Sequence, residues 1–449
     1  MNQTEDIMSS GYGIYEFAIN EKVHAIMNEV GDSAAIFDDT DSSPVKLPGK
    51  LANKYRGYVP WGNDNQLPYE VMQKIRKDEV MSQNKQFNTL TCYASGIRIE
   101  PETEGGTLSD EIRNFFKYNR LPRYFLEQCS DMKHFLFSVS VIILSKDGKS
   151  IVKLRHKEAI HTRFETCDPK TGKIEHLYYA NWEDNTPKED EIEIIPVLDI
   201  CDPIGDLEER INEQHTKERK FAIVNTFPTA GNKYYPFPYY WSVFLSGWYD
   251  IKRMIPAGKK AKLKNQSGIK YHVEVNRDYW ESICREEKIT DPELKAARIK
   301  KERENIKNFC TGIENSGKVW ISGFYQDPTG KETRMVRINL VDTTKEGGDW
   351  LEDSEEAANL ICYADNIHPN LVGAALGKSK NNMSGSDKRE LFTIKQALEK
   401  PYHDILLEPL FVIKEFNGWD DFKYDVPVIT LTTLDKGKDA EENTLRKEE

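Results

Sequence analysis

Residues Gly347–Phe411 read GGDWLEDSEEAANLICYADNIHPNLVGAALGKSKNNMSGSDKRELFTIKQALEKPYHDILLEPLF, and their pattern decides how the chain is organised. Apolar residues first recur at a helical spacing, which predicts an amphipathic helix. Asn366 and Pro369 end it, because the residue before a proline is disfavoured in the α region. Leu371–Gly385 is small and polar and predicts a loop. Asp387, with a glutamate three residues later, is the expected N-cap of a second helix.

Pro401 lies inside that second helical pattern and is expected to kink or break it. The stretch therefore predicts a helix, a tight turn, a polar loop and an interrupted helix. The apolar face of the first helix consists of Trp350, Ala357, Ala358, Ile361, Ala364 and Ile367. The second helix carries Leu391, Phe392, Ile394, Ala397 and Leu398.

Composition indicates a soluble globular protein with several structural units. The chain has 449 residues, of which 30% are charged and 38% hydrophobic. Its apolar runs are too short to cross a bilayer, and its first residues show no secretion signal. Seven scattered cysteines without a CxxC pair argue against a zinc site or a disulfide framework. The net charge of −12 argues against sequence-specific DNA binding, although it is compatible with a protein that lets DNA pass.

Upstream of this stretch, the sequence alternates between helical and strand patterns. Tyr58–Pro68 predicts a turn followed by a helix with proline near its start. Residues 68–137 are mostly helical in pattern, and a β-meander is expected from Ser138. Asp147-Gly148 and Thr171-Gly172 are the expected turns between its strands, and the acidic segment 183–193 predicts a solvated loop.

The aromatic segment Tyr234–Tyr249 precedes another helical pattern. That helix is expected over Trp241–Arg253, with Pro256 and Gly258 breaking it. Residues 268–280 alternate like a strand, and Asp291-Pro292 predicts the start of a charged helix. Further strands are expected at Gly317–Ile321 and Thr333–Leu340. Residues 1–50 are predicted to be peripheral, with a strand within SGYGIYEFAI.

The order of these features resembles the portal proteins of tailed bacteriophages, roughly from Tyr58 to Phe411. In that family a stem helix ends at a hydrophobic-x-Pro-x-x-hydrophobic-Gly turn, which matches Ile367–Gly373 here. A tunnel loop rich in Ser, Asn and Gly follows, matching Lys378–Gly385. A kinked helix with a phenylalanine about ten residues before a proline then matches Phe392 and Pro401.

The resemblance implies an α+β subunit with a wing, stem helices, an α/β clip and a helical crown. The implied parts are a peripheral N-terminal segment (1–57), the wing of helices and a β-meander (58–233), stem helix 1 (234–267), the clip with flanking strands (268–345), stem helix 2 (346–370), the tunnel loop (371–386), the kinked helix and crown (387–433) and a mobile tail (434–449).

The resemblance also implies a homo-oligomeric ring, typically a dodecamer, at one capsid vertex in the virion. Such a ring is the channel for DNA packaging and ejection. It docks the terminase large subunit and later head–tail adaptors, and it contacts the major capsid and scaffold proteins. Assembly would take place in the host cytoplasm. The chain itself would be neither an enzyme nor a membrane protein, and no cofactor or metal is implied.

Two groups of residues are candidates for contact with passing double-stranded DNA. Such contacts would be independent of sequence and sensitive to salt. A docking surface for an acidic partner and a solvated helix end are the alternatives for the second group. The candidate tunnel-loop residues are Lys378, Ser379, Lys380, Asn381 and Asn382. The basic cluster between stem and clip consists of Lys252, Arg253, Lys259, Lys260, Lys262 and Lys264.

Other chemistry is poorly supported by the sequence. Gly373–Ser379 is one residue short of a P-loop and follows a helix instead of a strand. His156 and His161 are five residues apart, which suits ordinary surface histidines better than a metal site. A nucleic-acid-processing enzyme would need clustered carboxylates or a nucleophile, and neither pattern is present. An adaptor-like head–tail interaction protein remains the closer alternative.

Overall fold

The computed structural model divides into two compact units, each described here by itself. The smaller unit comprises Met1–Ile26 and Ile255–Leu351, and the larger comprises Met27–Met254 and Glu352–Glu449. The structure describes residues 43–183, 186–212, 218–231, 234–265, 271–311, 324–326, 332–334, 336–340, 349–371 and 385–429.

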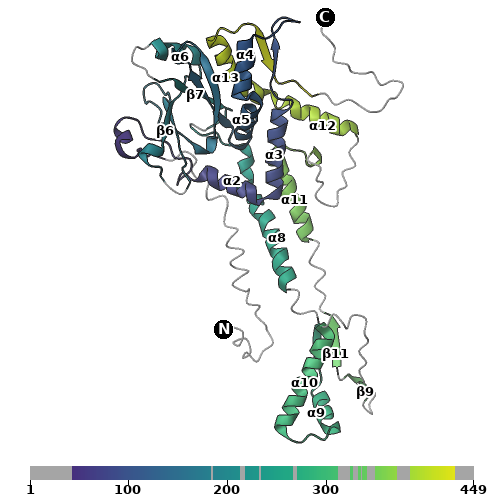
Figure 1. The fold of residues 1–449 in the computed structure, drawn as a ribbon. Coiled ribbons are helices and arrows are strands. Elements are labelled where there is room, and N and C mark those ends of the chain that lie inside the picture. Colours follow the sequence, from purple (N-terminus) through teal and green to yellow (C-terminus); the bar gives the residue numbers. More distant parts are fainter. Residues whose placement is uncertain are drawn as a thin grey trace, which may run out of the picture. The chain divides into compact units, whose positions relative to one another are not determined.

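The larger unit combines helices with short strands, as Figure 1 shows. The expected helical region 68–137 is confirmed, with a short strand interrupting it. Pro68 lies in the first turn of α2, where the missing N–H has no intrahelical acceptor in any case. The helices of this unit are α2 (Leu67–Lys77), α3 (Glu79–Tyr93), α4 (Asp110–Asn119), α5 (Leu121–Phe135), α6 (Pro203–Asn212), α7 (Ser242–Leu245), α12 (Gly385–Ala397) and α13 (Lys400–Phe416).

The strands of this unit form two three-stranded antiparallel sheets and one two-stranded sheet. Their orders are β3-β2-β7, β4-β5-β6 and β1-β12. The expected meander is therefore only partly correct, because β7 returns to pair with the free side of β2. Val139 of β2 faces Lys157 of β3 on one side and Val224 of β7 on the other. The strands are β1 (Arg98–Pro101), β2 (Phe137–Leu144), β3 (Ile151–Lys157), β4 (Thr162–Phe164), β5 (His176–Tyr179), β6 (Glu193–Pro196), β7 (Lys220–Thr226) and β12 (Phe422–Asp425).

The turn between β4 and β5 confirms the expected hairpin. Gly172 adopts a φ of 72°, which L side chains rarely adopt. A carboxylate oxygen of Asp168 accepts the backbone N–H of Lys170 at 2.6 Å and that of Thr171 at 3.2 Å. This Asx-type turn fixes the reversal of the chain.

Aromatic side chains fill the core beneath α2 and β2. Trp61 is fully buried and stacks on Tyr235 with the ring centroids 4.6 Å apart. Phe135 and Phe137 pack against the same indole at the end of α5 and the start of β2. The segment Tyr58–Pro68 thus joins α2 to the sheet through one aromatic residue.

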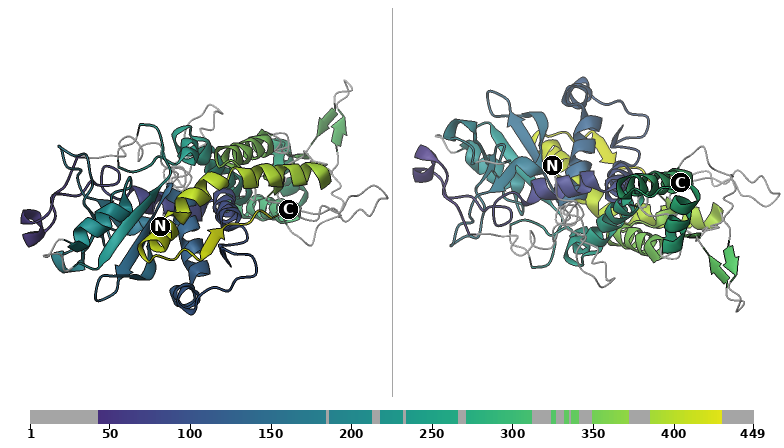
Figure 2. Two further views of the ribbon diagram at one scale, coloured as in Figure 1. Left: turned by 90° about the horizontal axis from the view of Figure 1, so that it is seen from above. Right: turned by 90° about the horizontal axis from the view of Figure 1, so that it is seen from below.

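A second core lies beneath α13. Figure 2 shows this helix, in yellow, beside the blue and teal strands of the β3-β2-β7 sheet. Leu410 and Ile413 of α13 pack with Phe116 of α4 and Phe221 of β7, and all are nearly or fully buried. The helix therefore packs against β7, the outer strand of the sheet, and against α5 and α6.

The position predicted for the break in the first stem helix is wrong. Helix α7 ends before Gly247, which has a φ of 79°. Helix α8 (Trp248–Asn265) then continues through Pro256 and Gly258, which were expected to stop it. A proline removes one N–H donor and crowds one carbonyl, and the alanine- and lysine-rich sequence that follows favours helix strongly enough to continue.

The amphipathic helix predicted at the start of Gly347–Phe411 is confirmed as α11 (Asp349–Ala364). Asn366 follows it with a φ of 53°, and Ile361 and Ile367 are buried as the spacing predicted. Pro401 marks a complete break, because α12 ends at Ala397 and Pro401 lies in the first turn of α13. Helix α12 begins before Asp387, so the expected N-cap lies in its first turn.

The smaller unit has a hairpin of helices and short antiparallel strands. Asp291 accepts the N–H of Glu293 at 2.8 Å and starts α10 as expected. The strand expected over 268–280 is wrong beyond Val275, because the Asn276 side chain accepts the N–H of Asp278 and starts a helix. The elements are β8 (Tyr271–Val275), α9 (Arg277–Glu286), α10 (Pro292–Thr311), β9 (Phe324–Gln326), β10 (Glu332–Arg334) and β11 (Val336–Leu340).

Candidate functional site

Buried ion pairs anchor the end of α11 to α3. The Lys85 ammonium in α3 lies 2.6 Å from a carboxylate oxygen of Asp365, and both side chains are less than a tenth exposed. Asn88, one turn further along α3, donates to the backbone carbonyl of Asp365 at 3.0 Å. Burial lowers the pKa of Lys85 to about 8, although Asp365 opposes the shift. The turn that follows α11 is thus tied to α3.

A second buried cluster anchors the end of α12. Glu399, only 1% exposed, pairs with Lys133 of α5 at 2.5 Å and with Lys395 of α12 at 3.3 Å. Lys395 also donates to the carbonyl of Asn366 at 3.4 Å. This contact joins the start of the 372–384 segment to the helix that follows it. We refer to Lys85, Lys133, Asp365, Lys395 and Glu399 as the anchor cluster.

Aromatic faces complete the environment of the anchor lysines. The Lys85 ammonium lies 3.0 Å from the ring centroid of Tyr240, and that of Lys133 lies 3.2 Å from the centroid of Tyr402. A ring face attracts a cation through its quadrupole, most strongly where water is excluded. The three anchor lysines thus share two carboxylates and two ring faces.

A thiol lies beside the same cluster. Cys92 of α3 is fully buried, and its carbonyl is 2.7 Å from Nε2 of His403. Burial opposes ionisation of the thiol, but hydrogen bonds with Cys129 and His403, and the nearby Lys133, lower its pKa to about 6. The thiol thus lies beside a cluster in which three lysines face two carboxylates.

The anchor cluster was not predicted from the sequence. Its lysines belong to amphipathic helices, where a lysine ordinarily faces solvent. A signal was nevertheless present, because Lys85 shares a helical face with Met81, Asn88 and Cys92, at spacings of three, four and seven residues. All four side chains are buried.

The candidate tunnel-loop residues Lys378, Ser379, Lys380, Asn381 and Asn382 lie outside the described residues, as does the P-loop-like segment Gly373–Ser379. The contacts that the structure gives belong to the residues on either side of this segment.

The predicted basic cluster is not one uniform surface. Lys252 is 5% exposed and pairs with Asp78 at 2.5 Å and with Glu79 at 3.0 Å, so its ammonium faces the junction of α2 and α3 instead of solvent. Arg253 is half-buried above the ring of Tyr249. Lys259 and Lys260 lie further along α8, the former half-buried and the latter exposed. Lys262 and Lys264 also belong to this helix.

The interpretation of His156 and His161 as ordinary surface histidines is wrong for His156. Its side chain is 6% exposed and its Nε2 lies 3.1 Å from a carboxylate oxygen of Asp131. The half-buried His161 has its Nδ1 2.9 Å from the hydroxyl of Tyr69. Both rings are packed against α-helices by hydrogen bonds, which a spacing argument could not show.

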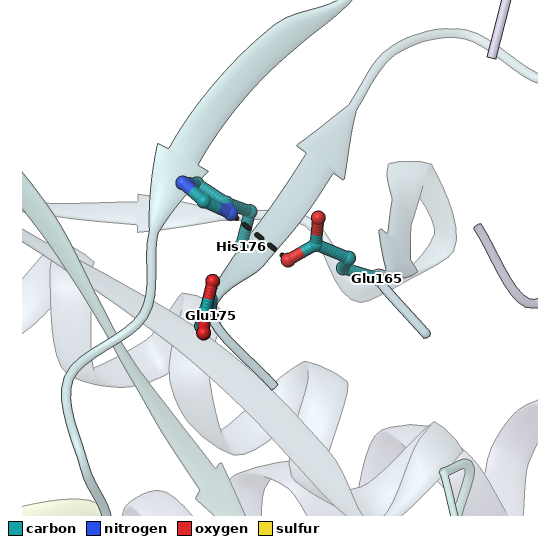
Figure 3. Close-up of side chains that lie close together, drawn as sticks. All are labelled: Glu165, Glu175 and His176. Atoms are coloured by element: carbon teal, nitrogen blue, oxygen red, sulfur yellow. Dashed lines mark hydrogen bonds and ion pairs between the residues drawn. The ribbon is translucent and has the colours of Figure 1, made fainter. Parts of the chain in front are cut away.

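One cluster has metal-ligand chemistry, and Figure 3 shows it at the β4–β5 hairpin. Ligand atoms of Glu165, Glu175 and His176 lie within 4.8 Å of one another. His176 Nδ1 is 2.9 Å from Glu165, and the Arg56 guanidinium lies 2.7 Å from Glu175. Tyr178 also donates to Glu165 at 2.9 Å. Arg56 already supplies the positive charge that a metal ion would bring. We therefore infer that this cluster stabilises the hairpin.

No protein-family profile matches the chain, and no curated protein matches it by sequence. The fold is nevertheless similar to solved structures. A chain from the neck of an empty gene transfer agent particle, determined with C6 symmetry, aligns over 89% of this chain and 90% of its own, with a TM-score of 0.54 and 11% identity. A chain from the neck of the native particle, determined with C12 symmetry, has the same coverage, a TM-score of 0.52 and 10% identity.

At these identities the similarity establishes a shared fold. It extends over 89% of this chain in both comparisons. In the described part of the chain, no helix has the length and hydropathy needed to cross a membrane.

Proposed function

We propose that the chain is the subunit of a ring-shaped portal at the capsid vertex of a phage or phage-like particle. The observation that carries this proposal is the fold similarity to neck chains of gene transfer agent particles over 89% of the chain. The C12 and C6 symmetries belong to those particles and motivate the proposal of a homo-oligomeric ring here. Helix α11, the turn after it, residues 372–384 and helix α12 follow one another along the chain, and this order is consistent with the role.

In this proposal the anchor cluster holds α11 and α12, the helices on either side of the tunnel loop. Double-stranded DNA passes the loop without sequence-specific contact, and Lys378, Lys380 and the neighbouring Ser379, Asn381 and Asn382 touch its backbone transiently. Ion pairs fixed in a buried site hold these helices in one position, because separating the pairs would leave charges unpaired.

The proposed partners follow from a portal's place in a particle. The ring would dock a terminase motor during packaging and a head–tail adaptor afterwards, and it would contact capsid and scaffold proteins. ATP hydrolysis would belong to the motor, so this chain would not itself be an enzyme. An acidic chain suits this role, since a negative channel lining repels DNA and prevents tight binding.

Negative-stain electron microscopy of the purified chain, with sedimentation velocity, tests the proposal. Rings with a central hole and a mass many times 51.9 kDa are the expected result. A chain that stays monomeric over a wide range of concentration and salt, with and without its capsid protein, would contradict it. An adaptor-like role would then become the better explanation of the shared fold.

A further inference from the structure

We propose that neighbouring copies of this chain pack through opposite edges of the β3-β2-β7 sheet, with a basic edge of one copy in an acidic cleft of the next. This inference rests on the ring proposed above and identifies the faces that would form it. A closed ring requires two different faces on each subunit, because each copy contacts the next head to tail. The larger unit carries two such faces, and they differ in charge.

The basic edge lies where α4 covers β3. The Asn119 side chain at the end of α4 accepts the N–H of Leu154 at 3.0 Å, and this bond fixes the helix end over the outer strand. Five exposed residues surround this junction, and Tyr118 among them is 72% exposed. We define the basic edge as Lys117, Tyr118, Arg120, Val152 and Lys153.

The cations of the basic edge are available to a partner. Within the described residues, Lys117, Arg120 and Lys153 form no ion pair. Their charges are therefore not neutralised by the same chain. An exposed tyrosine among unpaired cations is typical of binding surfaces, since the ring supplies apolar area and the charges supply orientation.

The acidic cleft lies along β7, at the other edge of the sheet. It has a volume of about 720 Å³, and β7, α6 and α13 contribute to its walls. Four carboxylates and two basic side chains line it. Three of the carboxylates are already paired within the chain, Glu175 with Arg56 at 2.7 Å, Asp199 with Lys173, and Asp206 with Arg210 at 2.9 Å. The remaining carboxylate, Glu408, gives the cleft its net negative charge.

Glu408 of α13 is the carboxylate best placed to receive a cation. Within the described part of the chain it forms no ion pair, and burial raises its pKa. Phe411, one turn further along α13, and Ile200 on the facing wall are 47% and 63% exposed. Glu209 is an exposed residue of α6, next in the chain to Arg210, which lines the cleft. The cleft thus offers apolar area and negative charge, the complement of the basic edge.

The strand order places these faces on opposite sides of one rigid element. Strand β2 lies between β3 and β7, so the two faces are separated by the width of the sheet. In a ring of copies related by rotation, the basic edge of each copy can then contact the acidic cleft of the next copy. Each copy uses each of its two faces once. A second copy of the chain is therefore the partner whose chemistry fits both faces together.

Charge-reversal variants of the full chain test this pairing. The first is Lys117→Glu with Lys153→Glu, and the second is Glu209→Lys with Glu408→Lys. The third combines all four changes and so exchanges the charges of the two faces. The control is Lys46→Glu with Lys388→Glu, which reverses two exposed lysines elsewhere. Assembly is followed by sedimentation velocity and mass photometry, and folding by circular dichroism.

Each two-residue variant is expected to raise the concentration needed for half-assembly at least tenfold, because like charges then face each other. The four-residue variant is expected to return to within about threefold of the wild type, and the control to stay there. Mixing the first two variants is expected to restore assembly as well, since each then meets a complementary face.

Three results would overturn the inference. If both two-residue variants form rings as readily as the wild type, these faces are not the interface, while the portal proposal stands. If each reversal blocks assembly with folding intact but neither the combination nor the mixture restores it, the faces do not contact each other directly. If the wild-type chain forms no ring in any condition, the proposed function fails and this inference with it.

Discussion

The Nζ atom of Lys85 lies 2.6 Å from Oδ1 of Asp365, although 280 residues separate them in the chain. The contact joins helix α3 to the turn after α11. Both groups are almost completely buried, so their charges were removed from water when the chain folded. Such a pair contributes little net stability. Each charge nevertheless needs the other close by, because a buried charge without its partner is strongly destabilising.

Replacing Lys85 with alanine is therefore expected to lower the free energy of unfolding by about 3–5 kcal/mol, because Asp365 would stay buried without a counter-charge. The double replacement Lys85→Met with Asp365→Leu is expected to recover much of that loss. Urea unfolding followed by tryptophan fluorescence measures all three proteins.

The exposed pair of Lys400 and Asp404 is the matched control. Lys400→Ala is expected to cost less than about 1 kcal/mol, because water already screens that pair. A loss for Lys85→Ala no larger than for Lys400→Ala would show that the buried pair does not constrain the fold.

Periodicity alone predicted the helices that bury one apolar face, including α2 to α5 and α11. It could not predict that β7 would pair with β2, since strand pairing over some eighty residues depends on tertiary packing and leaves no local signal. Nor could it place Lys85 or Lys133, because lysines in amphipathic helices usually face solvent. At Pro256 a local rule failed, since neighbouring helix-forming residues outweighed the cost of one lost hydrogen bond.

Arg163 is a buried cation held by neutral acceptors. It is 0% exposed, and its guanidinium donates to Ile160 O at 2.9 Å, Thr162 O at 2.8 Å and Asn65 O at 3.0 Å. Within the described residues no carboxylate pairs with it, and burial lowers its pKa. The planar guanidinium group has five N–H donors. Several neutral oxygens can therefore accept from it together and take the place of a counter-ion.

Arg163→Lys is therefore expected to destabilise the protein by about 2–4 kcal/mol, since an ammonium cannot reach all of these acceptors at once. Arg113→Lys, at an exposed position on α4, is the control and is expected to change stability by less than about 0.5 kcal/mol. Equal thermal unfolding midpoints for the two variants would show that the fork geometry is unimportant.

The hydroxyl of Tyr235 donates to the carbonyl of Val59 at 2.6 Å, beside the stacked ring of Trp61. Tyr235→Phe keeps the stacked ring and leaves that buried carbonyl without its donor. We expect a loss of about 1–3 kcal/mol in the free energy of unfolding. Tyr239→Phe tests the same chemical change at a side chain that is 61% exposed, where no measurable loss is expected.

His134 at the end of α5 should make stability depend on pH. Its Nδ1 lies 2.7 Å from the carbonyl of Ser130, so this nitrogen carries the proton in the neutral ring. Burial, together with the positive charge of Lys85, lowers the pKa of His134 below its usual value near 6.5. Between the two pKa values the unfolded chain binds more protons than the folded one. The contribution of His134 is thus fully present above pH 6.5 and is lost as pH falls through the folded pKa.

His134→Gln keeps a donor for the Ser130 carbonyl but cannot become charged. The wild type is therefore expected to lose more stability than this variant as pH falls from about 7 to about 5, by at most about 1.4 kcal/mol per pH unit. Carboxylates titrate in both proteins and cancel in the difference. His368→Gln, at an exposed position, is expected to run parallel to the wild type. Parallel curves for His134→Gln as well would mean that the buried imidazole titrates as it does in the unfolded chain.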